Sequence, residues 1–391
     1  MINDSSIKIN TWDIMFMIWY VTDACFNHTT IGIAGQALFL LYTFKELIIR
    51  QSVHINHTAF FFLLFCGACW LNISNGNAMS QGTARFMLNV LLRNLVFLFF
   101  LYNYLITVPF DKLIRVFVIS CLFGSAIMLL LNYSITGSIM MRDVEDSVNG
   151  NLQAVNNAIA IGLLYATSNK ESKRWLYISI VLFLFCILAG TKKSIIVLVI
   201  IAVGFVLMKN PRNLLGNIVK ISALMIALYI ILFEIPFFYD LIGNRFEGML
   251  GVLSDSDDVD ASTRTRSAFI ELGMSYITLR PITGYGIDCF REIPAAYGTY
   301  SHNNYIELAF GVGIPGAIVY YLMYVIPLIK GLKNWVRANN LFVMLGVMIC
   351  VGCLFADYGM VSYFDRPTYL RILMIVLFVN SVSYQEQDYE A

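Results

Sequence analysis

Charged residues are scarce in this chain. Only 13% of its 391 residues are Asp, Glu, Lys or Arg, whereas 59% are hydrophobic, and the mean hydropathy is +0.72. This composition excludes a soluble globular protein. Neither sign of charge is in excess, because 26 Lys and Arg stand against 25 Asp and Glu, and so no nucleic-acid partner is indicated. We expect a protein that lies in a membrane and carries out any chemistry at the membrane surface.

Long apolar runs occupy most of the chain. A helix that crosses a bilayer needs about 20 apolar residues, so the runs leave no room for a sizeable water-soluble domain. The segment after Met1 has neither a basic region nor a small-residue cleavage site, and we expect it to be retained in the first span. No internal repeat of roughly 20 to 50 residues is visible. The sequence predicts an all-α polytopic membrane helical bundle of about twelve transmembrane helices, near residues 11–26, 30–44, 58–74, 86–107, 113–135, 152–168, 174–189, 194–208, 213–235, 303–329, 339–357 and 367–383.

Lysine and arginine are unevenly divided between the connections of the two faces. In membrane proteins, the connections on the cytoplasmic face carry more lysine and arginine than those on the other face. We predict that this side holds both termini and fourteen cations, namely Lys8, Lys45, Arg50, Lys112, Arg115, Lys170, Lys173, Arg174, Lys209, Arg212, Lys220, Lys330, Lys333 and Arg337. The short connections of the other face carry Arg85, Arg142, Lys192, Lys193 and Arg366.

This assignment divides the chain into three parts. Residues 1–235 are predicted to hold transmembrane helices 1 to 9. Residues 236–302 form the one long connection, predicted to be a periplasmic loop that contains short helices. Residues 303–391 are predicted to hold transmembrane helices 10 to 12 and a cytoplasmic tail.

The cations of the long connection are all arginines, whereas nine of the fourteen cytoplasmic cations are lysines. A planar guanidinium donates two parallel hydrogen bonds and suits phosphate or carboxylate groups. We interpret this bias as a sign of anion binding. The arginines are Arg245, Arg264, Arg266, Arg280 and Arg291.

A helix is predicted to begin near Asp260 and to end at Arg280. Arg264 and Arg266 then lie in its first turn, where the macrodipole favours anions. They can bind a phosphate together with the helix terminus, contact lipid headgroups, or pair with the acidic residues that precede them. Residues two apart on a helix point about 200° from each other, so at most one should address a given site, and we assign Arg266.

Two patterns typical of metal sites are interpreted otherwise. The acidic run Asp255 to Asp260 contains an Asp-x-Asp, the spacing with which nucleotide-sugar enzymes hold a divalent metal. Because nucleotide sugars are cytoplasmic and the loop is predicted outside, we interpret the run as a solvated loop. The pairs Cys66–Cys69 and Cys350–Cys353 lie in apolar runs, which favours helix-core cysteines over a zinc site. No metal site is predicted.

His302 lies where the long connection enters the tenth predicted span, followed by Asn303 and Asn304. A helix N-terminus disfavours the imidazolium and keeps the ring neutral, the form that a general base requires. The sequence leaves open that His302 only hydrogen-bonds to lipid headgroups.

Four further cations depart from the charge rule or stand at the outer face. Lys192 and Lys193 lie in a tight outer turn between the seventh and eighth spans, which suggests an anionic ligand. Arg93 is deep in the fourth predicted span and is expected to face the bundle interior or a wet cavity. A structural pair with Glu307 is the alternative for Arg93. Arg85 is expected at the outer end of the same span.

Together these residues resemble the bacterial O-antigen polymerases and O-antigen ligases, which handle undecaprenyl-diphosphate-linked glycans at the outer face of the plasma membrane. The resemblance covers about residues 150 to 330. Gly190-Thr-Lys-Lys-Ser194 is similar to the family's turn before the eighth span, although Lys192 stands where an arginine is usual. The most specific segments are Arg266-Ser-Ala-Phe-Ile270, Arg280-Pro-Ile-Thr-Gly-Tyr-Gly286, His302-Asn-Asn-Tyr-Ile-Glu-Leu308 and Gly311-Val-Gly-Ile-Pro-Gly316.

The resemblance implies inverting glycosyl transfer from a lipid diphosphate donor in the inner membrane, with no metal and no cofactor. It implies His302 as the base and Arg266 as the diphosphate ligand. The remaining substrate-binding candidates are Lys192, Lys193, Arg264, Arg85, Arg93, Arg280, Arg291, Asn303 and Asn304. The partners expected are an undecaprenyl-diphosphate-linked oligosaccharide, membrane lipids and a polysaccharide chain-length regulator.

Three functions remain open from the sequence. A polymerase of O-antigen or capsular repeat units is favoured, because abundant aromatics (29 Phe and 22 Tyr) and an idiosyncratic loop suit one repeat unit. An O-antigen ligase would transfer the glycan to lipid A core or to a protein. A flippase of lipid-linked oligosaccharides is a third reading, but transporters usually place polar groups at the midplane between related halves.

Overall fold

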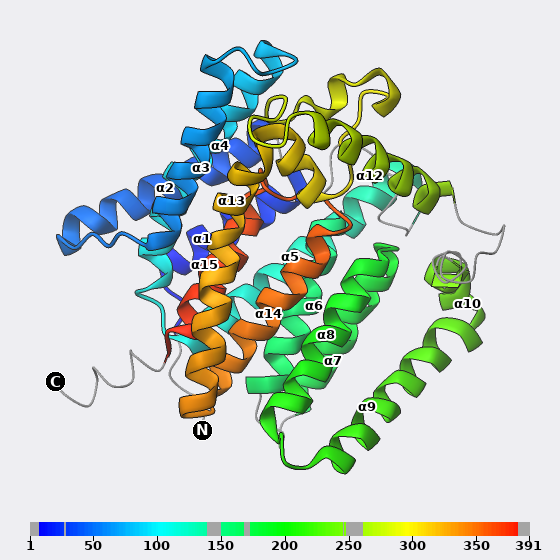
Figure 1. Cartoon of the computed structure of the whole chain (residues 1–391). Coiled ribbons are helices and arrows are strands. Elements are labelled where there is room, and N and C mark those ends of the chain that lie inside the picture. Colours follow the sequence, from blue (N-terminus) through cyan, green and yellow to red (C-terminus); the bar gives the residue numbers. More distant parts are fainter. Residues whose placement is uncertain are drawn as a thin grey trace.

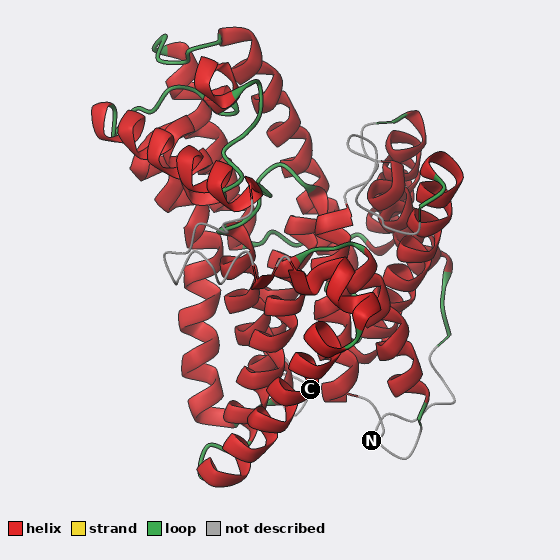
Figure 2. Ribbon diagram, turned by 90° about the vertical axis from the view of Figure 1, so that its right-hand side faces the viewer, coloured by secondary structure: helices red, strands yellow, loops and turns green. Residues whose placement is uncertain are grey.

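The computed structural model describes residues 8–26, 29–138, 150–167, 173–244, 246–247 and 261–381. Over these residues the regular structure is helical and no strand occurs (Figure 2). The predicted all-α class is confirmed. The helices are α1 (Thr11–Phe26), α2 (Thr30–Arg50), α3 (His57–Ser74), α4 (Gln81–Leu105), α5 (Phe110–Thr136), α6 (Gly150–Thr167), α7 (Arg174–Leu188), α8 (Lys192–Lys209), α9 (Leu214–Tyr229), α10 (Pro236–Phe238), α12 (Ala261–Leu279), α13 (Asn304–Ala338), α14 (Leu341–Asp357) and α15 (Arg366–Val379). Short turns of π-helix (η1, Ile230–Glu234; η2, Tyr239–Gly243) and of 3-10 helix (η4, Cys289–Glu292; η5, Pro294–Ala296) join them.

Every predicted apolar run forms a helix in its described residues. Six helical segments of the described chain are long and apolar enough to cross a membrane: α2, α3, α4, α5, Leu214–Glu234 and α13. The helices α7 and α14 are apolar but shorter. The chain is thus a helical membrane protein, and the count of about twelve crossings stays a prediction.

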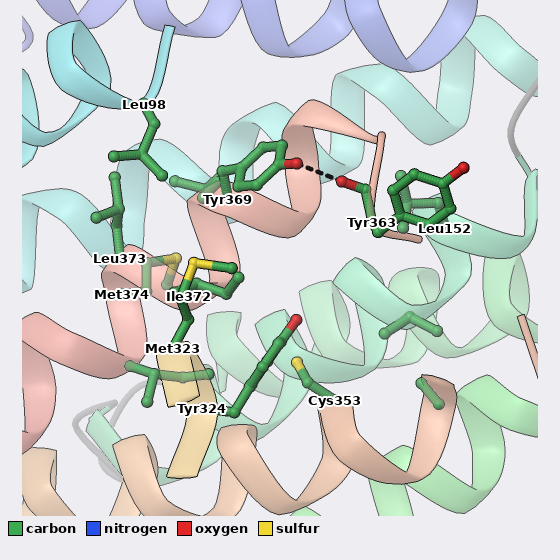
Figure 3. Packing of buried hydrophobic residues seen from close by; sticks show 14 of the residues in the cluster. Leu98, Leu152, Met323, Tyr324, Cys353, Tyr363, Tyr369, Ile372, Leu373 and Met374 are labelled. Carbon is green, nitrogen blue, oxygen red and sulfur yellow. Dashed lines mark hydrogen bonds between the residues drawn. The ribbon is translucent and has the colours of Figure 1, made fainter. Parts of the chain in front are cut away.

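The centre of the bundle is α15. Apart from Arg366 and Val376, every residue of this helix is buried. It packs against α4, α13 and α14, and Figure 3 shows Tyr369 and Leu373 within this core together with Met323 and Tyr324 of α13. Apart from Arg366, Thr368 and Arg371 the residues of α15 are apolar or aromatic, and a helix with so few polar side chains must be covered by other helices or by lipid. Here the other helices surround it (Figure 1).

All eight cysteines are buried and free. Cys66 and Cys69 lie inside α3, and Cys350 and Cys353 lie inside α14. Their interpretation as helix-core residues is confirmed.

The helix α13 is bent sharply on itself. Gly313 has φ 74° and ψ 170°, so two helical segments meet there. Tyr305 and Tyr321 would stand about 24 Å apart on a straight helix at 1.5 Å per residue, yet their rings stack with centroids 4.6 Å apart. The predicted span 303–329 is therefore not one straight helix. Residues 304–312 fold back beside the beginning of the long segment 314–338.

Glycines make this bend possible. The loop after α12 lies on the bend, where Tyr285 N donates to Phe310 O at 2.8 Å, Gly286 N donates to Gly311 O at 2.8 Å, and Ile314 N donates to Pro281 O at 2.7 Å. A Cβ on Gly313 would collide with the carbonyl oxygen of Ile282. The two glycine-rich segments of the sequence thus pack against each other. We call the end of the bundle that carries α12 and residues 280–303 the loop pole.

Replacing Gly313 with alanine should unfold this bend. The φ and ψ of Gly313 lie in a region open essentially to glycine alone, and backbone strain and overpacking each cost about 1 to 3 kcal/mol. We expect Gly313→Ala to lower the free energy of unfolding by about 3 kcal/mol or more, measured by thermal unfolding in detergent. Gly76 has φ 71° and open space around its Cβ, so Gly76→Ala should cost only about 1 kcal/mol. Equal losses would contradict the packing described.

Candidate functional site

His302 stands at the loop pole, just before the first turn of α13. Asn303 caps that turn, because its Oδ1 accepts from the N–H groups of Tyr305 at 3.0 Å and Ile306 at 3.1 Å. The buried Ser301 N–H donates to Glu307 Oε2 at 2.9 Å. These bonds fix the chain on both sides of His302, which adopts the left-handed φ of 57°. Such a backbone is uncommon outside glycine and is often found where a side chain must be aimed.

Two aromatic rings lie beside the ring of His302. It is parallel to Phe269 of α12, with centroids 6.2 Å apart, and its centroid lies 4.5 Å from that of Tyr300. The helix α12 holds Phe269 buried on the same side as Arg266, one turn earlier. Residues three apart on a helix share a face, so α12 presents both residues to the loop that carries His302.

Two cations stand near His302. Burial lowers the pKa of His302, and the charges of Arg266 on α12 and Lys193 at the beginning of α8 lower it further, to about 4. The ring is therefore neutral at pH 7. The side chain of Lys193 lies along the backbone at Gly359, where an added Cβ would come 3.1 Å from Lys193 Cδ. Three distant segments, near residues 193, 266 and 302, thus meet at the loop pole.

A hydrogen-bonded cluster lies beneath this group. Asn304 Nδ2 donates to Asp357 Oδ2 at 3.1 Å and to the Tyr321 hydroxyl at 3.1 Å. Its Oδ1 accepts from the backbone N–H groups of Ser362 and Tyr363. The Ser362 hydroxyl donates to Asp357 Oδ1 at 2.7 Å. Asn304 therefore joins the first turn of α13 to the connection between α14 and α15, and it is a positioning residue in this geometry.

The other predicted cations make different contacts or are exposed. Arg264 is exposed, whereas Arg266 is half-buried, as expected for residues on different sides of a helix. Arg280 lies with its guanidinium 4.8 Å from the centre of the Tyr285 ring. Arg291 donates from Nε and Nη2 to Asp288 Oδ1 at 3.1 and 2.7 Å. Arg85 is exposed and Lys192 is half-buried. The structure brings Arg266, Lys193, His302, Asn303 and Asn304 to one place.

The expectation for Arg93 is wrong. Its side chain is exposed on α4 instead of facing the bundle interior. Its Nε donates to the Asn89 carbonyl one turn earlier at 3.2 Å. The alternative pair with Glu307 is not formed either, since Glu307 accepts the Ser301 N–H and is buried. Asn94, the next residue, is a polar side chain that α4 turns inward.

Two residues of this region were missed from the sequence. Asp357 ends an apolar helix and is completely enclosed, and Arg371 is buried in α15 with Nη1 donating to Asn156 Oδ1 at 3.3 Å and Nη2 to Thr368 Oγ1 at 2.8 Å. An ionisable residue within a span is itself a sign of function, and Arg371 in Tyr369-Leu-Arg-Ile372 carried that sign. Asp357 ends an apolar run and is followed closely by Gly359, a pattern typical of the exposed end of a helix, so its burial could not be predicted.

The predicted loop is described only in part. Arg245 and the acidic run Asp255 to Asp260 lie outside the described residues. Among the residues that are described, no group of three or more His, Cys, Asp and Glu side chains is placed to hold a metal ion.

The comparison with known families identifies the segment that carries this geometry. Residues 177–321 match the family model described as O-antigen ligase. The match includes Lys193, Arg266 and His302 and ends at Tyr321, where α13 reaches the cluster around Asp357. No curated protein matches the chain. Over residues 177–321, the chain is therefore similar to the O-antigen ligase family.

Proposed function

We propose that this protein polymerises undecaprenyl-diphosphate-linked oligosaccharide repeat units at the outer face of the plasma membrane, by inverting glycosyl transfer without a metal. The observation that carries the proposal is the neutral ring of His302 beside Arg266 and Lys193. Burial and the charge of Arg266 lower the pKa of Lys193 to about 7, so a bound anion would favour its charged form. A base beside a guanidinium and such an amine suits a reaction that removes a proton and releases an anion. The family match supports a role in glycan assembly.

In the proposed reaction, an acceptor hydroxyl attacks the anomeric carbon of the donor from the face opposite the diphosphate. The new glycosidic C–O bond forms as the bond from the anomeric carbon to the diphosphate oxygen breaks. The hydroxyl proton passes to the free ring nitrogen of His302, and the polyprenyl diphosphate leaves with the bonding electron pair. The linkage configuration is inverted because attack comes from the rear.

Arg266 and Lys193 are proposed to stabilise the diphosphate leaving group. Negative charge grows on the diphosphate as the bond lengthens, and fixed cations in a partly buried site stabilise that charge more than water does. The same two cations disfavour a proton on His302, which keeps the base free before the acceptor arrives. One pair of charges thus serves both the leaving group and the base. Lys192 and Arg264 are proposed to assist binding from the rim.

The proposed orientation places the loop pole at the periplasm. It is supported by the fourteen-cation bias of the predicted cytoplasmic connections. Lipid-linked repeat units that have been flipped across the membrane would then reach His302 without crossing the bilayer again.

A ligase is the second candidate, favoured by the description of the matching family. The two functions differ in the acceptor, which is a second lipid-linked repeat unit for a polymerase and lipid A core for a ligase.

The test offers both acceptors to purified protein in vesicles. One sample receives lipid-linked repeat units alone, and a second receives the same donor together with lipid A core. A polymerase forms a ladder of products from the donor alone. If product appears only with lipid A core, the protein is a ligase, and if units cross the bilayer without extension, it is a flippase.

The pH dependence of the reaction should follow the pKa of His302. The ratio kcat/KM reports the free enzyme, so its acidic limb should lie near pH 4 for the native protein. Lys193→Met removes a neighbouring positive charge, which favours the imidazolium and raises the pKa of His302 toward its ordinary value. We therefore expect the acidic limb to move to higher pH, measured as kcat/KM across the acid range.

Lys209, at the opposite end of α8, provides the control for this experiment. Lys209→Met removes the same charge about 24 Å away along the helix and should leave the limb in place. An unchanged limb in Lys193→Met would mean that another group accepts the proton.

A further inference from the structure

The bend of α13 encloses an apolar groove next to the candidate site. Its volume is about 490 Å³, within the usual range for ligand pockets. Tyr305 and Ala309 line it from the segment that folds back, and residues of the long segment line the other side. The full lining is Tyr305, Ala309, Ile314, Ala317, Ile318, Tyr321, Leu322, Val325 and Leu354. Only carbon-rich surface and the two tyrosine rings face the groove.

The groove is continuous with the polar cluster around Asp357. Tyr321 contributes its ring to the groove and its hydroxyl to Asp357, at 3.2 Å. Tyr305 stacks on Tyr321 and donates its hydroxyl to the Leu354 carbonyl at 2.7 Å. Tyr305 also follows His302 by only three residues. The two tyrosines therefore form the boundary between an apolar channel and the polar cluster around Asp357. The charge of Asp357 acts in turn on Lys193, which connects this cluster to the cations near His302.

The other end of the groove reaches the lipid-facing surface. Ile314 and Ile318 line the groove and remain 45% and 56% exposed. From Ile314 to Val325 the long segment rises about 16 Å, which is about half the hydrocarbon thickness of a bilayer. A chain that enters from the bilayer can thus lie along α13 and end at the tyrosines.

We propose that this groove holds the head-proximal isoprenoid units of the donor lipid, with the diphosphate at Arg266 and Lys193. The inference rests on the proposed function. A polar headgroup joined to a long apolar chain matches a group of cations that is connected through the cluster around Asp357 to an apolar groove. The chain must belong to the donor, because only the donor's reacting carbon is attached to its lipid through the diphosphate. The acceptor hydroxyl lies on a sugar, remote from any lipid of its own.

Crosslinking tests which lipid occupies the groove. The chain offers a matched pair on α13: Ile318 lines the groove and is 56% exposed, whereas Ile326 is 42% exposed and does not line it. Ile318→benzoylphenylalanine and Ile326→benzoylphenylalanine are prepared in nanodiscs with radiolabelled undecaprenyl diphosphate. We expect crosslinking at position 318 only, and competition by unlabelled undecaprenyl diphosphate but not by added phospholipid. Equal labelling at both positions, or competition by phospholipid alone, would show a contact with ordinary bilayer lipid and overturn the proposal.

A second pair of variants covers the case in which the probe itself blocks the groove. Ile318→Trp fills the groove and should raise KM for the donor about tenfold or more with kcat little changed, because only chain binding is lost. Ile326→Trp should change neither. An unchanged KM in Ile318→Trp contradicts the inference.

If the radiolabelled lipid crosslinks at position 318 but no glycan is transferred, the assignment of the groove holds and the proposed function fails. If glycan is transferred but the lipid does not crosslink at position 318, the proposed function holds and the proposal that the groove binds the donor lipid is wrong.

Discussion

His302→Ala should lower the rate of glycosyl transfer by about 10²- to 10⁴-fold, the usual contribution of a general base. The ring is neutral because burial, Arg266 and Lys193 all lower its pKa, and its backbone is fixed by Asn303 and the Ser301–Glu307 bond. Removing the imidazole takes away the proton acceptor while both cations remain. We therefore expect the loss in kcat, with donor binding nearly intact, measured by initial rates and by equilibrium binding of the lipid donor.

His302→Gln separates a base from a binding group, since glutamine keeps hydrogen bonding without basicity. It should be about as slow as His302→Ala. His57, exposed at the beginning of α3, serves as control, and His57→Ala should transfer at the native rate. Near-native turnover by His302→Gln would mean that the ring only positions substrate.

Arg266→Lys should reduce transfer strongly even though the charge is kept. A lysine presents a point charge and cannot donate two parallel hydrogen bonds to one diphosphate. We expect a loss of about 10- to 100-fold in kcat/KM, corresponding to about 1.4 to 2.7 kcal/mol, and a larger loss for Arg266→Ala. Kinetics with the lipid-linked donor measure both.

Arg264 offers the matched comparison, because it lies two residues earlier on α12 and is exposed where Arg266 is half-buried. Arg264→Ala should have a clearly smaller effect than Arg266→Ala. The reverse order would assign the diphosphate to the other side of the helix. Full activity in Arg266→Ala would remove that residue from the site.

The helices were predictable because hydropathy and helix length are local properties. Each apolar run is helical in its described residues, and the cysteines of the runs lie in helix interiors as expected. The position of His302 directly before a helix was predictable for a local reason as well, since a polar Ser-His-Asn-Asn segment directly precedes an apolar run. Asn303 indeed caps the helix that follows.

The bend of α13 was not predictable from periodicity. The apolar pattern continues through Gly311-Val-Gly-Ile-Pro-Gly316, so a straight span was expected. The bend depends on contacts between this segment and residues 281–286. These two segments are distant in the sequence and meet only when the chain folds. The groove and the cluster around Asp357 both result from that bend, and neither has a sequence pattern of its own.

The depth of Arg93 in its apolar run was equally misleading. Hydropathy gives the position of a residue along a span but not the side of the helix on which it faces. The inward side of α4 is marked by Asn94, whose Nδ2 donates to the Phe364 carbonyl at 2.7 Å. Adjacent residues on a helix point about 100° apart, so an inward Asn94 leaves Arg93 at the surface.

The most direct test of the proposed chemistry is the release of the leaving group. Purified protein is reconstituted in vesicles with lipid-linked repeat units as the only glycan, in the presence of a metal chelator. The proposal predicts one undecaprenyl diphosphate released for each new glycosidic linkage, with inverted configuration and a ladder of products. Polymer formation without stoichiometric release of undecaprenyl diphosphate, or linkages of retained configuration, would contradict it.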